Sequence, residues 1–374
     1  MKTEGEKPAE EIPSQIDHYE VEGELARGGM GVVYAAFEPS LGRKVALKLV
    51  NKNLVKDKNV LARFDQEARA AADLKHANVV SIYFRGTFDG APYFAMELVE
   101  GESLADVVKK GPLKAEQAID YLLQTCRGLQ AADEKGLIHR DIKPANLMVT
   151  RRGEIKITDF GLAKALEGDA DLTHSGLVVG TPHYMSPEQA QGRELDCRSD
   201  IYSLGATFYH LLCGKRPFEK ASITGVLLAH VNEELPPLKD KCPTVPAPLC
   251  ATIEKMMAKR PHQRFSDYRA LISHVESLQQ ERTSAAKLDV TIAATQPAIS
   301  RLDDKTAHSE TEPNLRKTPG SVDDKGLEVE ELPIAEASKA LMFFTYCIAT
   351  GCSLFLAANL LRSWNLLVST GMVP

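Results

Sequence analysis

Apolar and polar positions follow two different periods along the chain. From Tyr19 to Glu97 the apolar residues fall in short runs that predict β-strands, with one helix over residues 63–75, where they recur at spacings of three and four. Beyond Gly101 the helical spacing dominates. The pattern therefore predicts an α+β chain whose first part is rich in strands and whose second part is rich in helices.

The helix-rich part divides at clear stop signals. A short helix is predicted over residues 103–110 and ends at Gly111 and Pro112, and a longer one is predicted over residues 115–135. The segment 200–213 is apolar on all sides, which is typical of a buried helix. We also expect a strand over residues 155–158 and a final helix over residues 268–280.

Two segments lack any such period. Residues 1–17 hold glutamates, lysines and prolines without the apolar core of a signal peptide, so we expect a disordered N-terminal tail. Residues 278–339 are dominated by Thr, Ser, Asp, Glu, Pro and Lys, and residues 282–339 contain no aromatic side chain. We expect a flexible linker there, because too little apolar surface is available to order the segment.

Residues 340–361 are apolar and carry no charge. As a helix this segment would be about 33 Å long, enough for a hydrocarbon core of roughly 30 Å. Lys339 and Arg362 flank it, and Trp364 lies where an interfacial anchor is expected. The alternative is an amphipathic helix docked on the protein, but apolar residues on every side favour a single transmembrane helix. Residues 362–374 would then form a short tail with no room for a folded sensor.

Composition narrows the class of protein. Apolar residues make up 44% and charged residues 26%, an ordinary globular balance. A net charge of -6 without basic runs argues against a nucleic-acid partner. The seven cysteines include no Cys-x-x-Cys pair, so reduced thiols in a cytosolic domain are expected rather than disulfides or zinc.

The strongest chemical signal is the segment 139–146 together with Asp159, which Phe160 and Gly161 follow. Asp141 is a carboxylate that could accept a hydroxyl proton, and Lys143 could contact a phosphate beside it. Asn146 and Asp159 offer oxygen ligands, which Mg²⁺ prefers. The combination suits phosphoryl transfer to an alcohol, whereas either segment alone would be read as ordinary loop carboxylates.

These segments resemble the catalytic and metal-binding loops of eukaryotic-type protein kinases, and the Asp-x-Lys-x-x-Asn spacing resembles the serine/threonine branch. Residues 180–189, Gly-Thr-Pro-His-Tyr-Met-Ser-Pro-Glu-Gln, look like the bacterial (Hanks-type) members. The resemblance implies a two-lobed kinase fold over residues 18–277, with a β-rich N-lobe over 18–97 and a helical C-lobe over 101–277. It also implies ATP with Mg²⁺, or Mn²⁺ in its place, as cofactors and protein serine or threonine hydroxyls as substrates.

By the same resemblance, a Gly-rich turn and the strand after it would hold the nucleotide phosphates. The turn departs from the kinase pattern because Ala26 occupies the place of the first glycine, and by itself it also fits a plain hairpin turn. Lys48 in Val-Ala-Leu-Lys would hold the α- and β-phosphates and be fixed by Glu67, whose alternative is a solvated helix face. The turn residues are Leu25, Ala26, Arg27, Gly28, Gly29, Met30, Gly31, Val32 and Val33.

The resemblance places adenine at the end of the strand that follows. The backbone of Glu97 and Val99 would bond its edge, and Met96 would close the back of the pocket, although plain core packing explains Met96 equally well. The apolar roof and floor would come from Val33, Ala46 and Met148.

Residues 162–185 resemble an activation segment. Thr173 and Ser175 occupy the places of paired activating hydroxyls, Thr181 lies in the substrate loop, and Arg140 could pair with a phosphate on the segment. Three further residues would hold the large lobe together: Asp200 would bond the catalytic-loop backbone, and Arg264 would be the buried partner of Glu188.

Together these features predict a membrane-anchored serine/threonine protein kinase with its catalytic domain in the cytoplasm, where ATP is, and one pass through the inner or plasma membrane. Asn359 within the span is a candidate for helix association, which would make a homodimer. The alternative is a pseudokinase scaffold, which the presence of Lys48, Asp141 and Asp159 disfavours. A small-molecule kinase is disfavoured by the complete activation segment.

Overall fold

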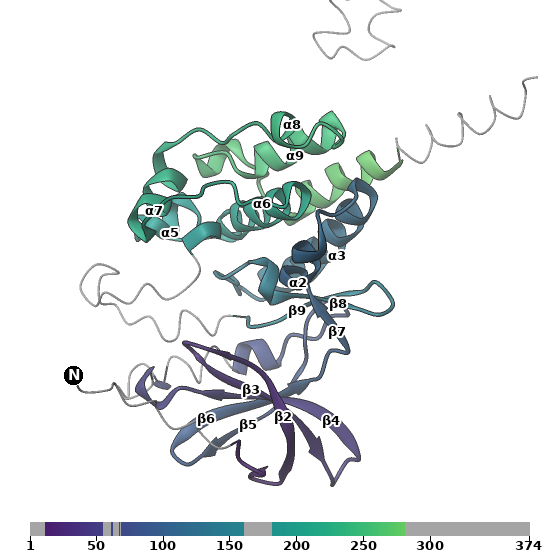
Figure 1. Ribbon diagram of the computed structural model, residues 1–374, viewed down its shortest axis with the longest axis vertical. Helices are drawn as coiled ribbons and strands as arrows, with labels where there is room; N and C mark the ends of the chain where they lie inside the picture. The colour runs from purple at the N-terminus through teal and green to yellow at the C-terminus, as the bar shows by residue number, and fades with distance from the viewer. Residues whose placement is uncertain (1–11, 55–60, 63–66, 68, 161–181, 281–374) are drawn as a thin grey trace, which may run out of the picture. The chain divides into compact units, whose positions relative to one another are not determined.

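The computed structural model describes residues 12–54, 61–62, 67, 69–160 and 182–280 (Figure 1), all within one compact unit of the chain. In Figure 1 the small lobe, an antiparallel sheet, lies below, and the helices of the large lobe lie above it. The small sheet β7–β9 lies between them. This two-lobed arrangement, with strands in the first part and helices in the second, is the one that the sequence predicts.

The small lobe is a six-stranded antiparallel sheet in the order β1-β2-β3-β4-β6-β5. Side chains alternate between more and less buried positions along β3, and the first six residues of β6 are buried. These strands give the lobe its own core, which includes Tyr19, Tyr34 and Tyr93. The strands are β1 (Gln15–Ile16), β2 (Tyr19–Gly28), β3 (Gly31–Glu38), β4 (Arg43–Val50), β5 (Ile82–Phe88) and β6 (Ala91–Glu97), and a 3₁₀ turn η1 (Lys52–Leu54) follows β4.

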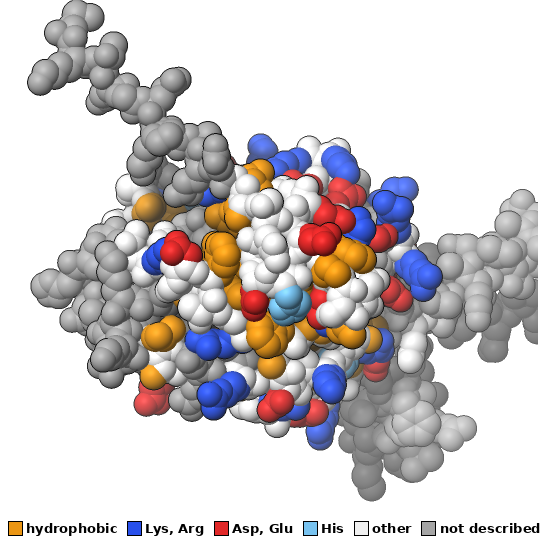
Figure 2. Space-filling view, turned by 90° about the horizontal axis from the view of Figure 1, so that it is seen from below, with side chains coloured by type: hydrophobic (Ala, Val, Ile, Leu, Met, Phe, Trp, Pro, Cys, Tyr) orange, Lys and Arg blue, Asp and Glu red, His pale blue; other side chains and the backbone are white. Residues whose placement is uncertain are grey.

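The predicted helix of the small lobe is described in part. Residues 61–62, 67 and 69–72 are helical, so the helix ends three residues earlier than predicted. Ala71 and Leu74 are buried and join the core of the large lobe. On the face seen in Figure 2, hydrophobic side chains lie in small groups separated mainly by backbone and uncharged polar side chains, and most lysines and arginines lie toward the edge.

The large lobe begins with a three-stranded sheet in the order β7-β8-β9. Its strands are β7 (Gly101–Ser103), β8 (Leu147–Thr150) and β9 (Ile155–Ile157), and the 3₁₀ turns are η2 (Pro144–Asn146), η3 (Pro182–Tyr184) and η4 (Pro261–Gln263). The helices are α2 (Leu104–Lys110), α3 (Ala115–Asp133), α5 (Pro187–Ala190), α6 (Cys197–Cys213), α7 (Ile223–Asn232), α8 (Leu238–Lys241) and α9 (Ala247–Met256). Residues 268–280 form a last helix.

Helix α6 is the centre of the large lobe. Thirteen of its seventeen residues are buried, as the all-round apolar pattern predicts. It begins three residues before the predicted start, because the Asp196 side chain accepts a hydrogen bond from the Arg198 N–H and caps the first turn. Gly205 allows the chain at Met256 and Met257 to pack closely, since a Cβ at this position would lie 2.8 Å from the Met257 side chain.

Several predictions concern other parts of the chain. The last helix continues through Gln280, so residues 278–280, placed at the start of the predicted linker, are helical. No helix within residues 12–280, gaps excepted, is long and apolar enough to cross a membrane. The predicted span 340–361, the linker from 281 onward, the tail 362–374, the first eleven residues and the sites Thr173, Ser175 and Thr181 lie outside the described residues.

Candidate active site

The loop that carries Asp141 is held by a buried carboxylate. Asp200, on the first turn of α6, accepts hydrogen bonds from the backbone N–H groups of His139 at 2.7 Å and Arg140 at 2.8 Å. Burial raises the pKa of Asp200, and these two N–H groups oppose that effect. The contact that the sequence predicts for Asp200 is therefore present.

Arg140 has a left-handed backbone, with φ at 68°. Such a conformation costs on the order of 1–3 kcal/mol in a residue with a side chain and persists only where neighbours enforce it. Gln189, behind the Ser-Pro-Glu motif, donates from its side-chain amide to the Arg140 carbonyl at 2.7 Å. The loop is thus fixed from both sides, by α6 and by α5.

Asp141 is held by the two residues that the sequence grouped with it. The Lys143 ammonium lies 2.6 Å from Asp141 Oδ2, and the Asn146 side-chain amide donates to the Asp141 carbonyl at 2.8 Å and to Oδ2 at 3.1 Å. Because its nitrogen faces Asp141, the Asn146 amide directs its oxygen away from that carboxylate. The loop therefore offers a carboxylate, a cation and an amide oxygen within the short segment 141–146.

Asp159 follows β9 and faces the small lobe. Its φ of 63° turns the chain sharply, and its Oδ1 lies 2.6 Å from the ammonium of Lys48 on β4. Burial by itself would raise the pKa of Asp159, but the charge and hydrogen bond of Lys48 outweigh it and hold the pKa below its usual value. Asp159 is therefore ionised at neutral pH and available to a cation.

Backbone contacts join the two metal-ligand candidates. The Thr158 N–H donates to the Asn146 carbonyl at 2.9 Å, and the Thr158 hydroxyl donates to the same oxygen at 3.2 Å. His139 bonds the Thr158 carbonyl from the other side at 2.8 Å. Asn146 and Asp159, thirteen positions apart in the sequence, are thereby held next to each other.

Lys48 is 5% exposed, and its ammonium forms an ion pair with Asp159. Its strand register places it opposite Val33 on β3 and Phe94 on β6, so the sheet fixes where the ammonium points. Glu67 lies half-buried on the helix of the small lobe. The predicted pairing of Lys48 with Glu67 stays a prediction.

The apolar residues assigned to the adenine pocket gather in one cluster. Ala46 and Met96 are buried there with Val80, and Val33 and Val99 pack against them. The Glu97 N–H donates to the Ser81 carbonyl, and its carboxylate pairs with Lys156 at 2.6 Å. Met148 lies on β8, paired with Ser103 at the start of the large lobe. The contacts predicted between adenine and the chain stay predictions.

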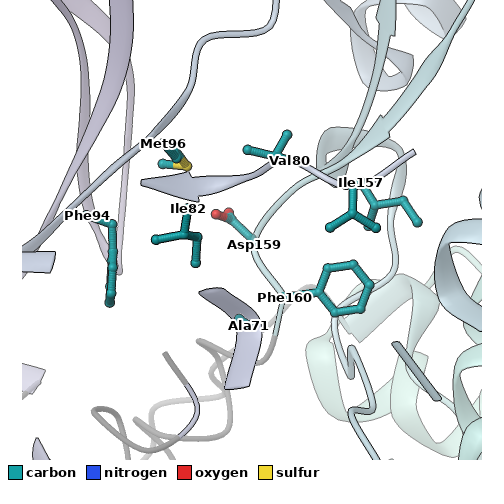
Figure 3. A pocket seen from close by; sticks show the side chains of 9 residues that line it. Ala71, Val80, Ile82, Phe94, Met96, Ile157, Asp159 and Phe160 are labelled. Atoms are coloured by element: carbon teal, nitrogen blue, oxygen red, sulfur yellow. The ribbon is translucent and has the colours of Figure 1, made fainter. Parts of the chain in front are cut away.

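Behind Met96 lies a small cavity (Figure 3). Its walls come from both lobes, and Figure 3 shows Asp159 directed toward Ile82 and Met96, with Phe160 on the opposite side. The lining residues are Ala71, Val79, Val80, Ile82, Phe94, Met96, Ile157, Asp159 and Phe160. The cavity places the Asp159 carboxylate against apolar walls, which accounts for the burial that acts on its pKa.

The Gly-rich turn is a hairpin between β2 and β3. Gly28 pairs with Gly31, and Ala26 lies in extended strand opposite Val33, so alanine fits there without strain. At Gly31, whose φ is 145°, a Cβ would lie 2.0 Å from the Leu49 carbonyl. This glycine is therefore required by the packing of the strands, whatever its role toward phosphate.

A buried ion pair connects the end of the active-site region to the rest of the large lobe. Arg264 donates to both carboxylate oxygens of Glu188, at 2.6 and 2.9 Å, as the sequence predicts. Ser199 donates to the same carboxylate at 2.7 Å. Burial would raise the pKa of Glu188, but its bonds to Arg264 lower it below the ordinary value.

Sequence reasoning missed Gln189 as a support of the catalytic loop. It also missed Asn78, whose side-chain amide donates to the Ile155 carbonyl at 2.9 Å and whose own carbonyl accepts from the Ile157 N–H. Neither residue has a sequence pattern of its own, and the residues to which they donate hydrogen bonds lie far along the chain, 49 positions from Gln189 and 77 from Asn78. The motif Pro-Glu-Gln, which ends in Gln189, is the one signal that could have indicated the first.

Comparison with known proteins decides the family. A family model described as "Protein kinase domain" matches residues 19–277. The chain belongs to this family. The chain is 38% identical over 280 residues to a probable serine/threonine-protein kinase of Corynebacterium efficiens, and the match covers 72% of this chain and 42% of that one.

Two further relatives agree. The kinase domain is 41% identical over 253 residues to the serine/threonine-protein kinase PknA of Mycobacterium tuberculosis, covering 66% of this chain and 58% of that one. It also resembles the crystal structure of the Mycobacterium tuberculosis PknI kinase domain, with a TM-score of 0.58 and 25% identity over 71% of this chain and 99% of that one. The match spans 42% to 58% of the two curated relatives' length.

Proposed function

We propose that the chain is a protein-serine/threonine kinase, which transfers the γ-phosphoryl group of ATP to serine and threonine hydroxyls of other proteins. One observation carries the proposal. Asp141, Asn146, Asp159 and Lys48 lie around one site and are linked to one another directly or through Thr158. The named functions of the relatives support it.

The roles follow from chemistry at each atom. Asp141 accepts the proton of the attacking hydroxyl, while Lys143, 2.6 Å from it, neutralises charge that develops on the transferring group. Lys48 holds the α- and β-phosphates, oriented by Glu67. Lys48 then exchanges part of its contact with Asp159 for contact with the nucleotide.

The donor set fits magnesium bound together with a nucleotide. Among the described residues, no group of three or more His, Cys, Asp or Glu side chains could hold a metal ion by itself. Asn146 and the ionised Asp159 supply two oxygen ligands, and Mg²⁺ commonly completes its shell with substrate phosphates and water. Bound there, Mg²⁺ or Mn²⁺ would neutralise charge on the phosphate oxygens.

The test is phosphate transfer to a protein substrate. The full chain, purified in detergent, is incubated with Mg-ATP and casein, and phosphoserine and phosphothreonine are measured by mass spectrometry. We expect wild type and the exposed control Lys241→Met to phosphorylate casein and Lys48→Met to lose at least a hundredfold in rate. Nucleotide binding without transfer by the wild type would identify a scaffold and end the proposal.

Activation is proposed to occur by autophosphorylation of Thr173 or Ser175. Arg140 carries the cation that would pair with the new phosphate, and its backbone is fixed by Asp200 and Gln189. Thr181 is proposed to lie against the substrate in the same segment. If Thr173→Ala with Ser175→Ala keeps full activity, and the wild type carries no phosphate there, activation by this route is wrong.

Membrane attachment is proposed through residues 340–361, with the kinase domain on the cytoplasmic side and Asn359 favouring a homodimer. The support is the uncharged stretch between Lys339 and Arg362. Expressed in bacteria, the chain should sediment with membranes and resist carbonate extraction, whereas a chain shortened after residue 300 should not. Release of the full chain by carbonate would exclude a span.

A further inference from the structure

A second, larger groove lies on the surface beside the helix of the small lobe. It has a volume of about 730 Å³ and is lined from four segments: the start of β4, the chain after the helix, the start of β5, and β9. The lining residues are Arg43, Ala72, Lys75, His76, Ala77, Ser81, Ile82, Tyr83 and Lys156. It shares Ile82 with the cavity of Figure 3, and none of the residues assigned to catalysis line it.

The lining residues include two lysines, one arginine and one histidine but no aspartate or glutamate. Arg43 pairs with Glu38 at 2.6 Å and lies 3.9 Å over the ring of Tyr83, and Lys156 pairs with Glu97 at 2.6 Å. Lys75 is exposed, and within the described part of the chain no carboxylate lies within 4 Å of it. Lys75 therefore gives the groove a positive charge in a chain whose net charge is -6.

His76 lies half-buried among the residues that line the groove. Its Nδ1 accepts a hydrogen bond from the Asn78 N–H at 3.1 Å, which leaves Nε2 to carry the ring proton as a donor. Burial lowers the pKa of His76, and the charges of Arg127 and Lys156 lower it further. Both of these neighbouring charges are positive, and one of them, Lys156, lines the groove itself.

We propose that this groove binds an acidic segment of a protein partner. Lys75 and His76 supply donors to carboxylates, and Ala72, Ala77 and Ile82 supply an apolar wall for side chains between them. A volume near 730 Å³ falls within the range of roughly 300–1,000 Å³ typical of ligand sites. Nucleic acid fits less well, because it is bound through many phosphate contacts along an extended basic surface, and the chain is acidic overall.

The test is a binding titration that does not depend on phosphoryl transfer. The full chain in detergent, without nucleotide, is titrated against a fluorescein-labelled peptide of repeated Glu-Glu-Leu units, with the matching Gln-Gln-Leu peptide as control, and fluorescence anisotropy gives Kd. Lys75→Glu reverses one charge in the groove. Lys241→Glu, an exposed lysine on α8, is the matched charge control.

We expect the Glu-Glu-Leu peptide to bind wild type and Lys241→Glu equally and its Kd to rise about tenfold in Lys75→Glu, because an attraction becomes a repulsion. Casein phosphorylation should be unchanged in Lys75→Glu, which separates this proposal from the proposed catalysis. Equal binding of the two peptides, an equal loss of affinity in Lys75→Glu and Lys241→Glu, or no binding of either peptide would overturn the proposal. If vesicles of phosphatidylglycerol bind in a way that depends on Lys75 and neither peptide binds, the groove binds lipid instead, and the proposal is overturned.

Discussion

Removing Arg264 should destabilise the large lobe in a way that depends on pH. Arg264 is 4% exposed and Glu188 6% exposed, and the arginine donates to both oxygens of the carboxylate. In Arg264→Met the carboxylate stays buried and loses its counter-charge. It retains the hydrogen bond from the Ser199 hydroxyl. Breaking a buried pair by removing one partner typically costs on the order of 3–5 kcal/mol.

The pH dependence can be derived from Glu188. In the wild type its pKa is lowered below the ordinary value of 4.5, so the pair contributes its full stability above about pH 4.5 and loses it as pH falls through the folded-state pKa. In Arg264→Met the buried carboxyl escapes its charge by taking up a proton. Starting from the ordinary pKa of 4.5 and at about 1.36 kcal/mol per pH unit, protonation of Glu188 costs at most about 3.4 kcal/mol at pH 7 and about 0.7 kcal/mol at pH 5.

Arg264 also donates hydrogen bonds to the backbone carbonyls of Arg198, Ala258 and Lys259. Their loss adds a destabilisation that does not change with pH, on the order of 2 kcal/mol. We therefore expect Arg264→Met to lose about 5 kcal/mol at pH 7 and about 3 kcal/mol at pH 5 relative to wild type. Urea unfolding followed by circular dichroism measures both values. The double variant Arg264→Met with Glu188→Gln, which has no buried charge, should lose the same amount at both pH values and exceed the single variant in stability at pH 7.

Equal destabilisation of Arg264→Met at the two pH values would refute this reasoning. So would a double variant that is no more stable than the single one at pH 7. Either result would mean that Glu188 is solvated once the arginine is gone, and that the pair acts through packing alone.

Three further predictions concern the large lobe. Gly205→Ala should lower the free energy of unfolding by about 1–3 kcal/mol, because the new Cβ would lie under 3.0 Å from two methionine side chains. The control Gly23→Ala, whose Cβ would have nothing within 4 Å, should change the free energy of unfolding little. Urea unfolding of both variants measures the difference. His230 is buried, and burial lowers its pKa from 6.5 to about 3, so the stability of the wild type decreases as pH falls below 6.5. From pH 7 to pH 5 the wild type should therefore lose about 2 kcal/mol of stability relative to His230→Phe. An unchanged difference between the two proteins would contradict this prediction. Gln189→Ala removes a hydrogen bond to the catalytic loop and should slow casein phosphorylation about tenfold without raising the KM for ATP. The control Gln191→Ala should keep the wild-type rate. Equal rates in the two variants would mean that the loop is held without the Gln189 side chain.

The sequence predicts the fold well where one local signal decides an element. The buried helix α6 follows from an apolar run, and the last helix follows from its stripe over residues 268–280. Strand β7 was not predicted, because three residues are too few to show a period and its pairing with β8 comes from a segment 46 positions later. Helix ends differ by about three residues where a cap or a turn, such as that at Asp196, outweighs the period.

The candidate site is predictable in its residues and less so in its geometry. Motif spacing identifies Asp141, Asn146 and Asp159, because these residue types suit phosphoryl transfer and their order and spacing resemble those of protein kinases. The left-handed backbones of Arg140 and Asp159 could not be predicted, since side chains disfavour them and only distant contacts enforce them. The same holds for Gln189, whose partner lies 49 positions away.

The central claim is that Asp141 acts on the reacting hydroxyl and not on nucleotide binding or folding. The most direct measurement compares Asp141→Asn with wild type in two quantities, the rate of casein phosphorylation at saturating Mg-ATP and the Kd of the nucleotide. The account predicts that the rate falls on the order of 10²–10⁴-fold while Kd changes less than about twofold. Rate and affinity that fall together, or a rate that stays near wild type, would contradict it.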